Sequence, residues 1–223
     1  MIAILEKGSK FLIGVLFVPA AYVAGAVLWR SVESAPFFSG GGAYFAGGVF
    51  CYFVLHTLVW EPTWFYVLGH ELTHAFFGLL FRAKVSRVEI SAAGGTTTLS
   101  KSNFLISLGP YLVPFYTLIF MVAFLVLRMT GHAAYFVKPF LAAIGFTWAM
   151  HLVMTVKFIR MDQPDIIRTG QLFSLVVIAL VNIVMLAGVL SVAVPQLEFK
   201  AYVWESALRI RQAYQSIFKQ LFF

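Results

Sequence analysis

The sequence predicts an all-α polytopic membrane protein with about six transmembrane helices, a small β-hairpin insertion and a C-terminal amphipathic helix. Two features of the composition lead to this class. Hydrophobic residues make up 61% of the 223 residues, whereas soluble domains average about 45–50%. Charged residues make up 11%, against about 25% in soluble domains. So few charges cannot cover the surface of a soluble chain of this size, and the apolar content excludes a disordered one.

The third observation is a set of six apolar runs, each near the roughly 20 residues that a helix needs to cross the hydrocarbon core. Trp29, Trp60 and Trp64 lie at the edges of runs, as in the aromatic belts of membrane interfaces. The first run is longer than the apolar core of a usual signal peptide, so we expect a retained helix. The runs are residues 11–29, 43–60, 64–81, 103–127, 139–156 and 171–194.

Residues 83–100, between the third and fourth runs, predict a β-hairpin. Residues 85–90 alternate in polarity, Ala93, Gly94 and Gly95 supply a turn, and residues 96–99 are rich in β-branched threonine. Sheet edges are not stable in lipid, so this hairpin must be shielded by protein or lie at the membrane interface.

The last segment, residues 196–223, predicts an amphipathic helix that lies on the membrane surface. Its apolar positions recur at helical spacing, and polar residues at the same spacing form the opposite face. The alternative is a helix packed against a partner domain. The apolar positions are Val203, Ile210, Tyr214, Ile217 and Leu221.

The net charge of +7 comes from 16 basic and 9 acidic residues. The basic residues are scattered through short loops and the C-terminal segment, so a lipid bilayer with anionic headgroups is the expected partner and nucleic acid is not. We expect an integral, multi-pass protein of the cell membrane. Cys51 is the only cysteine, which excludes an internal disulfide.

A single charged residue, Glu71, lies inside an apolar run. A carboxylate within a membrane helix costs roughly 2.5–3.5 kcal/mol on insertion scales and indicates a functional role. Glu71 belongs to the H-E-x-x-H motif His70-Glu71-Leu72-Thr73-His74. Two histidines one helical turn apart can bind one zinc ion, and Glu71, about 100° around the helix, can act as general base on water. The alternative is a pair of core histidines hydrogen-bonded to a buried glutamate.

A catalytic zinc ion needs a third protein ligand and an open position for water. Asp165 is the preferred candidate, because it follows a proline and precedes apolar residues, which allows it to point into the helix bundle. Asp162 is a second candidate, and either aspartate could instead cap the next helix. His151, in the fifth run, could stabilise an oxyanion or orient a ligand, or could form an ordinary interhelical hydrogen bond.

This pattern resembles the site-2 protease family of intramembrane zinc metallopeptidases. The resemblance is carried by four features: the H-E-x-x-H motif, Gly94-Gly95-Thr96 in the hairpin, Ser107-Leu108-Gly109-Pro110 entering the next helix, and Asp165. The chain looks like a short, divergent member of that family. Gln163-Pro164-Asp165-Ile166 replaces the usual Leu-Asp-Gly, Val113 stands where an asparagine is common, and no PDZ-type domain fits into this length.

The resemblance implies His70 and His74 as zinc ligands, Glu71 as general base and Asp165 as the third ligand. It implies a transmembrane metallopeptidase domain over residues 1–195, with a core at about 60–194, followed by the interfacial helix at 196–223. The implied activity is that of a zinc metalloendopeptidase with one Zn²⁺. Its substrates would be membrane-embedded proteins, as in regulated intramembrane proteolysis.

Three alternatives stay open. A non-proteolytic membrane protein could keep a zinc site for binding or regulation, although structural zinc sites usually fill all four positions with Cys or His. A transporter would carry several buried charges or broken-helix repeats, whereas only Glu71 lies within a run. A different class of zinc peptidase would use a glutamate ligand, such as Glu198 or Glu205.

Overall fold

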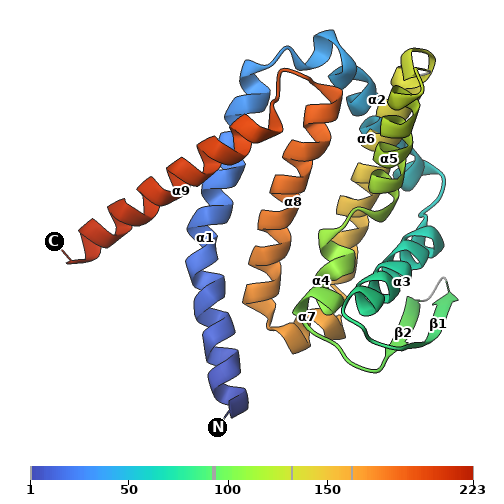
Figure 1. Ribbon diagram of the computed structural model, residues 1–223. Coiled ribbons are helices and arrows are strands. Elements are labelled where there is room, and N and C mark those ends of the chain that lie inside the picture. The colour runs from blue at the N-terminus through green and yellow to red at the C-terminus, as the bar shows by residue number, and fades with distance from the viewer. Residues whose placement is uncertain (1, 92–93, 132, 162, 223) are drawn as a thin grey trace. The chain divides into compact units, whose positions relative to one another are not determined.

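The structure is a computed structural model that describes residues 2–91, 94–131, 133–161 and 163–222. Helices dominate the described chain, with one two-stranded sheet between α3 and α4 (Figure 1). The elements are α1 (Ile2–Ser34), the 3₁₀ turn η1 (Phe37–Ser39), α2 (Gly41–Leu58), α3 (Thr63–Leu80), β1 (Val85–Ser91), β2 (Gly94–Leu99), α4 (Phe104–Leu112), α5 (Phe115–Met129), α6 (Ala133–Ile159), α7 (Pro164–Thr169), α8 (Gln171–Ala193) and α9 (Phe199–Phe222).

Four helices of the described chain are long and apolar enough to cross a membrane: α1, α2, α6 and α8. The pair α4 and α5 qualifies as a fifth span only together, because the two helices are bent by 68° at the break between them. Pro114 accounts for this break. It has no N–H to continue the helix, and it favours the extended conformation seen at Val113 (φ −109°, ψ 112°). These spans agree with the predicted membrane protein.

The predicted count of about six spans is not confirmed. The third apolar run corresponds to α3, which is neither among the four spanning helices nor part of the bent pair. Its side chains explain this result, because four buried polar residues lower the mean hydropathy of an 18-residue helix. They are His70, Glu71, Thr73 and His74. The polar residues that indicate chemistry therefore also weaken the signal for a membrane span.

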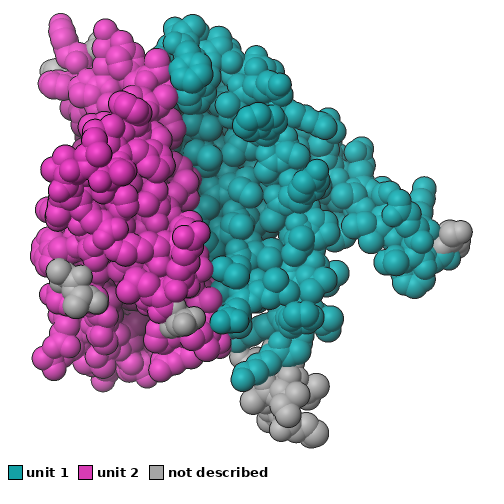
Figure 2. Space-filling model, turned by 180° about the vertical axis from the view of Figure 1, so that it is seen from behind, with its two compact units in different colours: residues 1–40, 170–223 teal, residues 41–169 magenta. Residues whose placement is uncertain are grey.

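The described chain divides into two compact units, residues 1–40 with 170–223 and residues 41–169 (Figure 2). In the first unit α1 packs closely on α8. A Cβ added at Gly14 would lie 3.0 Å from the backbone nitrogen of Phe173, so this contact requires glycine.

The predicted C-terminal helix is present as α9, in the same unit. The Tyr202 hydroxyl donates to the Ala24 carbonyl of α1 at 3.3 Å, and the Tyr214 hydroxyl donates to the Leu16 carbonyl. Trp204 and Phe218 stay exposed on α9. Its location on a membrane surface, and the domain boundary after residue 195, stay predictions.

The second unit is built around the α2–α6 pair. A Cβ added at Gly48 would lie 1.9 Å from the Ala142 carbonyl oxygen, and one added at Gly145 would lie 2.0 Å from the Phe45 carbonyl oxygen. Small residues at such positions let two helix backbones approach closely, as in membrane helix pairs. This contact fixes α6, whose C-terminal half faces the candidate site.

The predicted hairpin is confirmed as β1 and β2, which pair antiparallel with Val88 opposite Thr97. Gly94 and Gly95, which were expected in the turn, instead pair with Ser91 and Ile90 as the first residues of β2, and Ala93 lies outside the described residues. The chain leaves α3 through Arg82, which adopts a left-handed conformation (φ 57°), and Ala83 N–H bonds back to the Gly78 carbonyl at 2.8 Å. This helix end reverses the chain. Both strands therefore pack on α3.

Candidate metal centre

The candidate centre starts from one side of α3. His70, Glu71, Thr73 and His74 are 7%, 5%, 2% and 8% exposed. The Thr73 hydroxyl donates to the Gly69 carbonyl at 2.7 Å within the same helix. Buried histidines and a buried carboxylate need specific partners, because removing them from water without compensation is costly. Neighbouring elements supply partners for His74 and Glu71.

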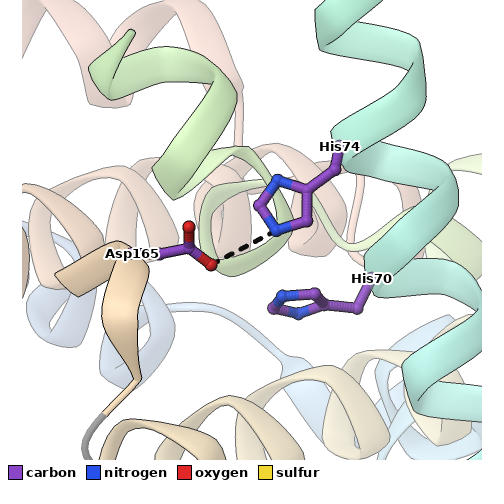
Figure 3. A group of neighbouring side chains, drawn as sticks. All are labelled: His70, His74 and Asp165. Atoms are coloured by element: carbon purple, nitrogen blue, oxygen red, sulfur yellow. Dashed lines mark ion pairs between the residues drawn. The ribbon is translucent and has the colours of Figure 1, made fainter. Parts of the chain in front are cut away.

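Asp165, in the first turn of α7, meets the two histidines. One ligand atom from each of His70, His74 and Asp165 lies within 4.8 Å of the others. The His74 Nε2 and Asp165 Oδ2 atoms are 3.3 Å apart, and Figure 3 shows the side chains converging from α3 and α7. Zinc bonds of about 2.0–2.1 Å in tetrahedral geometry place neighbouring ligand atoms roughly 3.3 Å apart. The His74–Asp165 pair already has that separation.

The ring of His74 is oriented by a backbone carbonyl. Its Nδ1 atom lies 2.8 Å from the Ile106 oxygen in α4. A carbonyl only accepts, so Nδ1 carries a proton and donates it. In the neutral ring, Nε2 then presents a lone pair to the Asp165 carboxylate, which also accepts. Two facing acceptors need a cation, either a second proton on the ring or a metal ion, and a backbone-bonded histidine is the usual arrangement around a metal.

His70 supplies an independent test of fit. Its Nδ1 atom is buried and has no hydrogen-bond partner among the described residues. Buried polar atoms without a partner are rare. Two imidazoles and one carboxylate form a donor set that zinc accepts, with a fourth position left open. The residues present therefore fit a single zinc ion held by His70, His74 and Asp165.

Glu71 is held by the hairpin. The Thr97 hydroxyl, on β2, lies 2.7 Å from Glu71 Oε2 and 3.1 Å from the Glu71 carbonyl oxygen, and it donates toward both. Gly95, two residues earlier on the same strand face, packs against the same side chain. A Cβ added there would lie 2.5 Å from Glu71 Cγ. The hairpin thus fixes the carboxylate of Glu71, which follows His70 directly on α3.

Sequence reasoning named His70, Glu71, His74 and Asp165, and the structure brings all four together in one unit. The contacts of Thr97 and Gly95 with Glu71 were not predicted; Gly95 was assigned to the hairpin turn and to the family resemblance. The sequence contained a signal for these contacts. Residues two apart on a strand share a face, so Gly95 and Thr97 are expected on the same side of the hairpin. The Ile106 contact had no such signal, since it is made by a backbone atom from another helix.

Of the remaining candidates, those that the structure describes are not members of the metal-binding group. His151 is buried on α6 and lines, with His70, Thr73 and Thr147, a cavity of about 20 Å³. That volume accommodates about one water molecule. Asp162 lies outside the described residues. Among the described residues the metal-binding group includes neither Glu198 nor Glu205.

Comparison of the chain with protein-family models, curated proteins and solved structures finds no match. Function is therefore inferred from the chemistry of the site itself.

Proposed function

We propose that this protein is an intramembrane zinc metalloprotease that hydrolyses peptide bonds of membrane-embedded substrates. One observation carries the proposal: the two histidines of an H-E-x-x-H motif meet Asp165 within 4.8 Å, beside the buried Glu71. The donor set favours a catalytic site over a structural one, because structural zinc sites usually have four protein ligands. The spanning helices support a location in the membrane.

His70, His74 and Asp165 would hold the metal, and zinc when bound would polarise the scissile carbonyl and acidify water. Glu71 accepts a proton from the attacking water as the water oxygen bonds to the carbonyl carbon. Glu71 then delivers that proton to the amine nitrogen as the carbon–nitrogen bond breaks. Thr97 steadies the carboxylate through both steps by its 2.7 Å hydrogen bond.

The substrate must present an extended backbone, because helical hydrogen bonds shield the carbonyls of a membrane helix. The sheet has only the strands β1 and β2 within the described chain, so each strand has an edge without a strand partner. An extended peptide can add to such an edge through main-chain hydrogen bonds. The hairpin would then align the substrate while Gly95 and Thr97 hold Glu71 beside it.

The test is the zinc content and the proteolysis of purified wild type and Glu71→Ala, reconstituted in lipid. The wild type should hold about one zinc ion per chain and cleave membrane protein substrates. Candidate substrates would be found by comparing membrane fragments from cells that express either form. The Glu71→Ala variant should keep the metal and lose cleavage, because Glu71 is the base and not a ligand.

Two results would overturn the proposal. Full cleavage by Glu71→Ala would remove Glu71 from the chemistry. The wild type could also bind zinc but cleave no membrane protein. That result would support the alternative, a non-proteolytic zinc-binding membrane protein.

A further inference from the structure

The contact between His74 and Ile106 depends on a feature of α4. In an α-helix each carbonyl accepts from the N–H four residues later. The Ile106 carbonyl should therefore accept from residue 110, but residue 110 is a proline and has no N–H. This proline leaves the Ile106 oxygen without its regular main-chain donor. His74 Nδ1 lies 2.8 Å from that oxygen.

Main-chain bonding is present at both ends of α4, so the loss of a donor at Pro110 is a local feature. Ser107 N–H bonds to the Asn103 carbonyl at 2.9 Å, and Val113 N–H bonds to the Gly109 carbonyl at 2.9 Å. A proline ring also crowds the carbonyl four residues earlier. An external donor, here the His74 ring, can therefore take the place of the missing N–H.

The surrounding contacts hold this carbonyl in place. Ile106 is 2% exposed, and its own N–H donates to the Asn103 side chain at 2.9 Å, which caps α4. Gly109 lets α4 approach α3, because a Cβ there would lie 2.7 Å from Phe77 Cδ2. The donor and the acceptor are thus presented by two closely packed helices.

We propose that Pro110 is a positioning residue that selects the tautomer of His74. By lacking an N–H, it reserves the Ile106 carbonyl for the Nδ1 proton of His74, which leaves Nε2 free to bind a cation beside Asp165. The inference rests on the proposed metal centre and deepens it. Partners of this kind orient metal-binding histidines, and their loss typically costs 10–100-fold in metal affinity.

The direct test is Pro110→Ala, which adds an N–H that competes for the Ile106 carbonyl. In the metal-free protein, at an alkaline pH where the His74 ring is neutral, ¹⁵N NMR of that ring, assigned by its loss in His74→Gln, reports which nitrogen carries the proton. We expect wild type to show a protonated Nδ1 and the variant to show a mixture of tautomers. Zinc affinity, measured by competition with a chelator, should fall about tenfold.

A matched control separates this effect from the general cost of removing a helix proline. Pro139 lies inside α6, and neither the His74–Ile106 contact nor the His74–Asp165 contact involves it. Pro139→Ala should leave both the His74 spectrum and the zinc affinity unchanged. A change as large as that of Pro110→Ala would show that helix straightening in general, and not the Ile106 carbonyl, is responsible.

A second variant keeps the test valid if Pro110→Ala alters the fold. Replacement of Pro110 by lactic acid, the hydroxy acid analogue of alanine, removes the ring but adds no N–H. This ester variant should behave like wild type. Wild-type spectrum and affinity in Pro110→Ala, or an ester variant that behaves like Pro110→Ala, would overturn the inference. If wild type binds no zinc, the proposed function fails, whereas the metal-free spectrum still tests the role of Pro110.

Discussion

Two parts of the second unit are stabilised in different ways. The α2–α6 pair is held by close backbone contact, with Gly48 and Gly145 each facing a carbonyl of the other helix. The α3 region is held by directed polar contacts, from Thr97 to Glu71 and from His74 to the Ile106 carbonyl. Close packing fixes where helices lie, whereas hydrogen bonds fix where individual polar atoms point. Mutations in the two parts should therefore affect different measurements.

The largest effect is expected for Asp165→Ala. Removing one of three protein ligands should lower zinc affinity by more than about 100-fold, beyond the 10–100-fold typical of outer contacts. The measurement is the zinc content of the purified protein together with chelator competition. Helical content should be preserved, because the Asp165 side chain is partly exposed and belongs to a six-residue helix.

Glu198→Ala is the matched control for that prediction. It removes a carboxylate that is not in the metal-binding group, so zinc affinity should match wild type. Loss of zinc in Glu198→Ala with retention in Asp165→Ala would reverse the ligand assignment and favour a different peptidase class.

Substitution of Gly48 should lower stability and leave zinc binding unchanged, which is the opposite of the pattern expected for Asp165→Ala. In Gly48→Ala the new Cβ would lie 1.9 Å from the Ala142 carbonyl oxygen, and a backbone atom cannot move aside without shifting the helix. Overpacking of this kind typically lowers the free energy of unfolding by about 1–3 kcal/mol. Unfolding in a denaturing detergent measures this loss, and zinc per folded molecule should not change.

Gly47→Ala serves as the comparison, because nothing lies within 4 Å of its added Cβ. It should be neutral or slightly stabilising, since alanine favours a helix by up to about 1 kcal/mol over glycine. Equal destabilisation by both substitutions would mean that close approach is not what holds α2 against α6.

The difference between the two parts also explains what could be predicted from the sequence. The H-E-x-x-H spacing placed His70 and His74 on one helix face, and the context of Asp165 singled it out. Such patterns are predictive because residues close in sequence keep their spacing within a helix. The role of α3 as a span was not confirmed, because its four buried polar residues lower its mean hydropathy. Tertiary contacts compensate the burial of Glu71 and His74. Those contacts come from distant segments, as with Ile106, so no local pattern contains them.

A smaller effect is expected for Thr97→Val, which removes the hydroxyl and keeps the shape of the side chain. A hydrogen bond to a charged group contributes about 1.5–3 kcal/mol. Part of that bond is replaced by water, so proteolysis should fall about tenfold, equivalent to about 1.4 kcal/mol. Zinc affinity should stay at the wild-type value. Thr98 lies on the opposite and exposed face of β2, so Thr98→Val should leave proteolysis and zinc affinity unchanged. A drop in zinc affinity for Thr97→Val would mean that Glu71 is a ligand.

The smallest effect concerns the ion pair that links the two parts. Glu61, in the connection between α2 and α3, bonds to Lys157 near the end of α6, and His56 Nε2 lies 3.6 Å from the same carboxylate. The hydrogen bond from Lys157 lowers the pKa of Glu61 below its ordinary value of 4.5. A lowered pKa means that the folded state favours the ionised form, so the contribution is present at neutral pH and is lost as pH falls through that lowered pKa.

The Glu61 side chain is 40% exposed, so solvent screening limits this contribution to below about 1 kcal/mol. Glu61→Gln should therefore lower the free energy of unfolding slightly at pH 7 and have no effect once the wild-type carboxyl is protonated. Unfolding of both proteins across acidic pH measures the difference. If the free energy of unfolding of Glu61→Gln stays several kcal/mol below that of wild type at acidic pH, Glu61 acts through packing and not through its charge. The pair would then belong with the glycine contacts of α2 and α6, whose contribution to stability does not depend on pH.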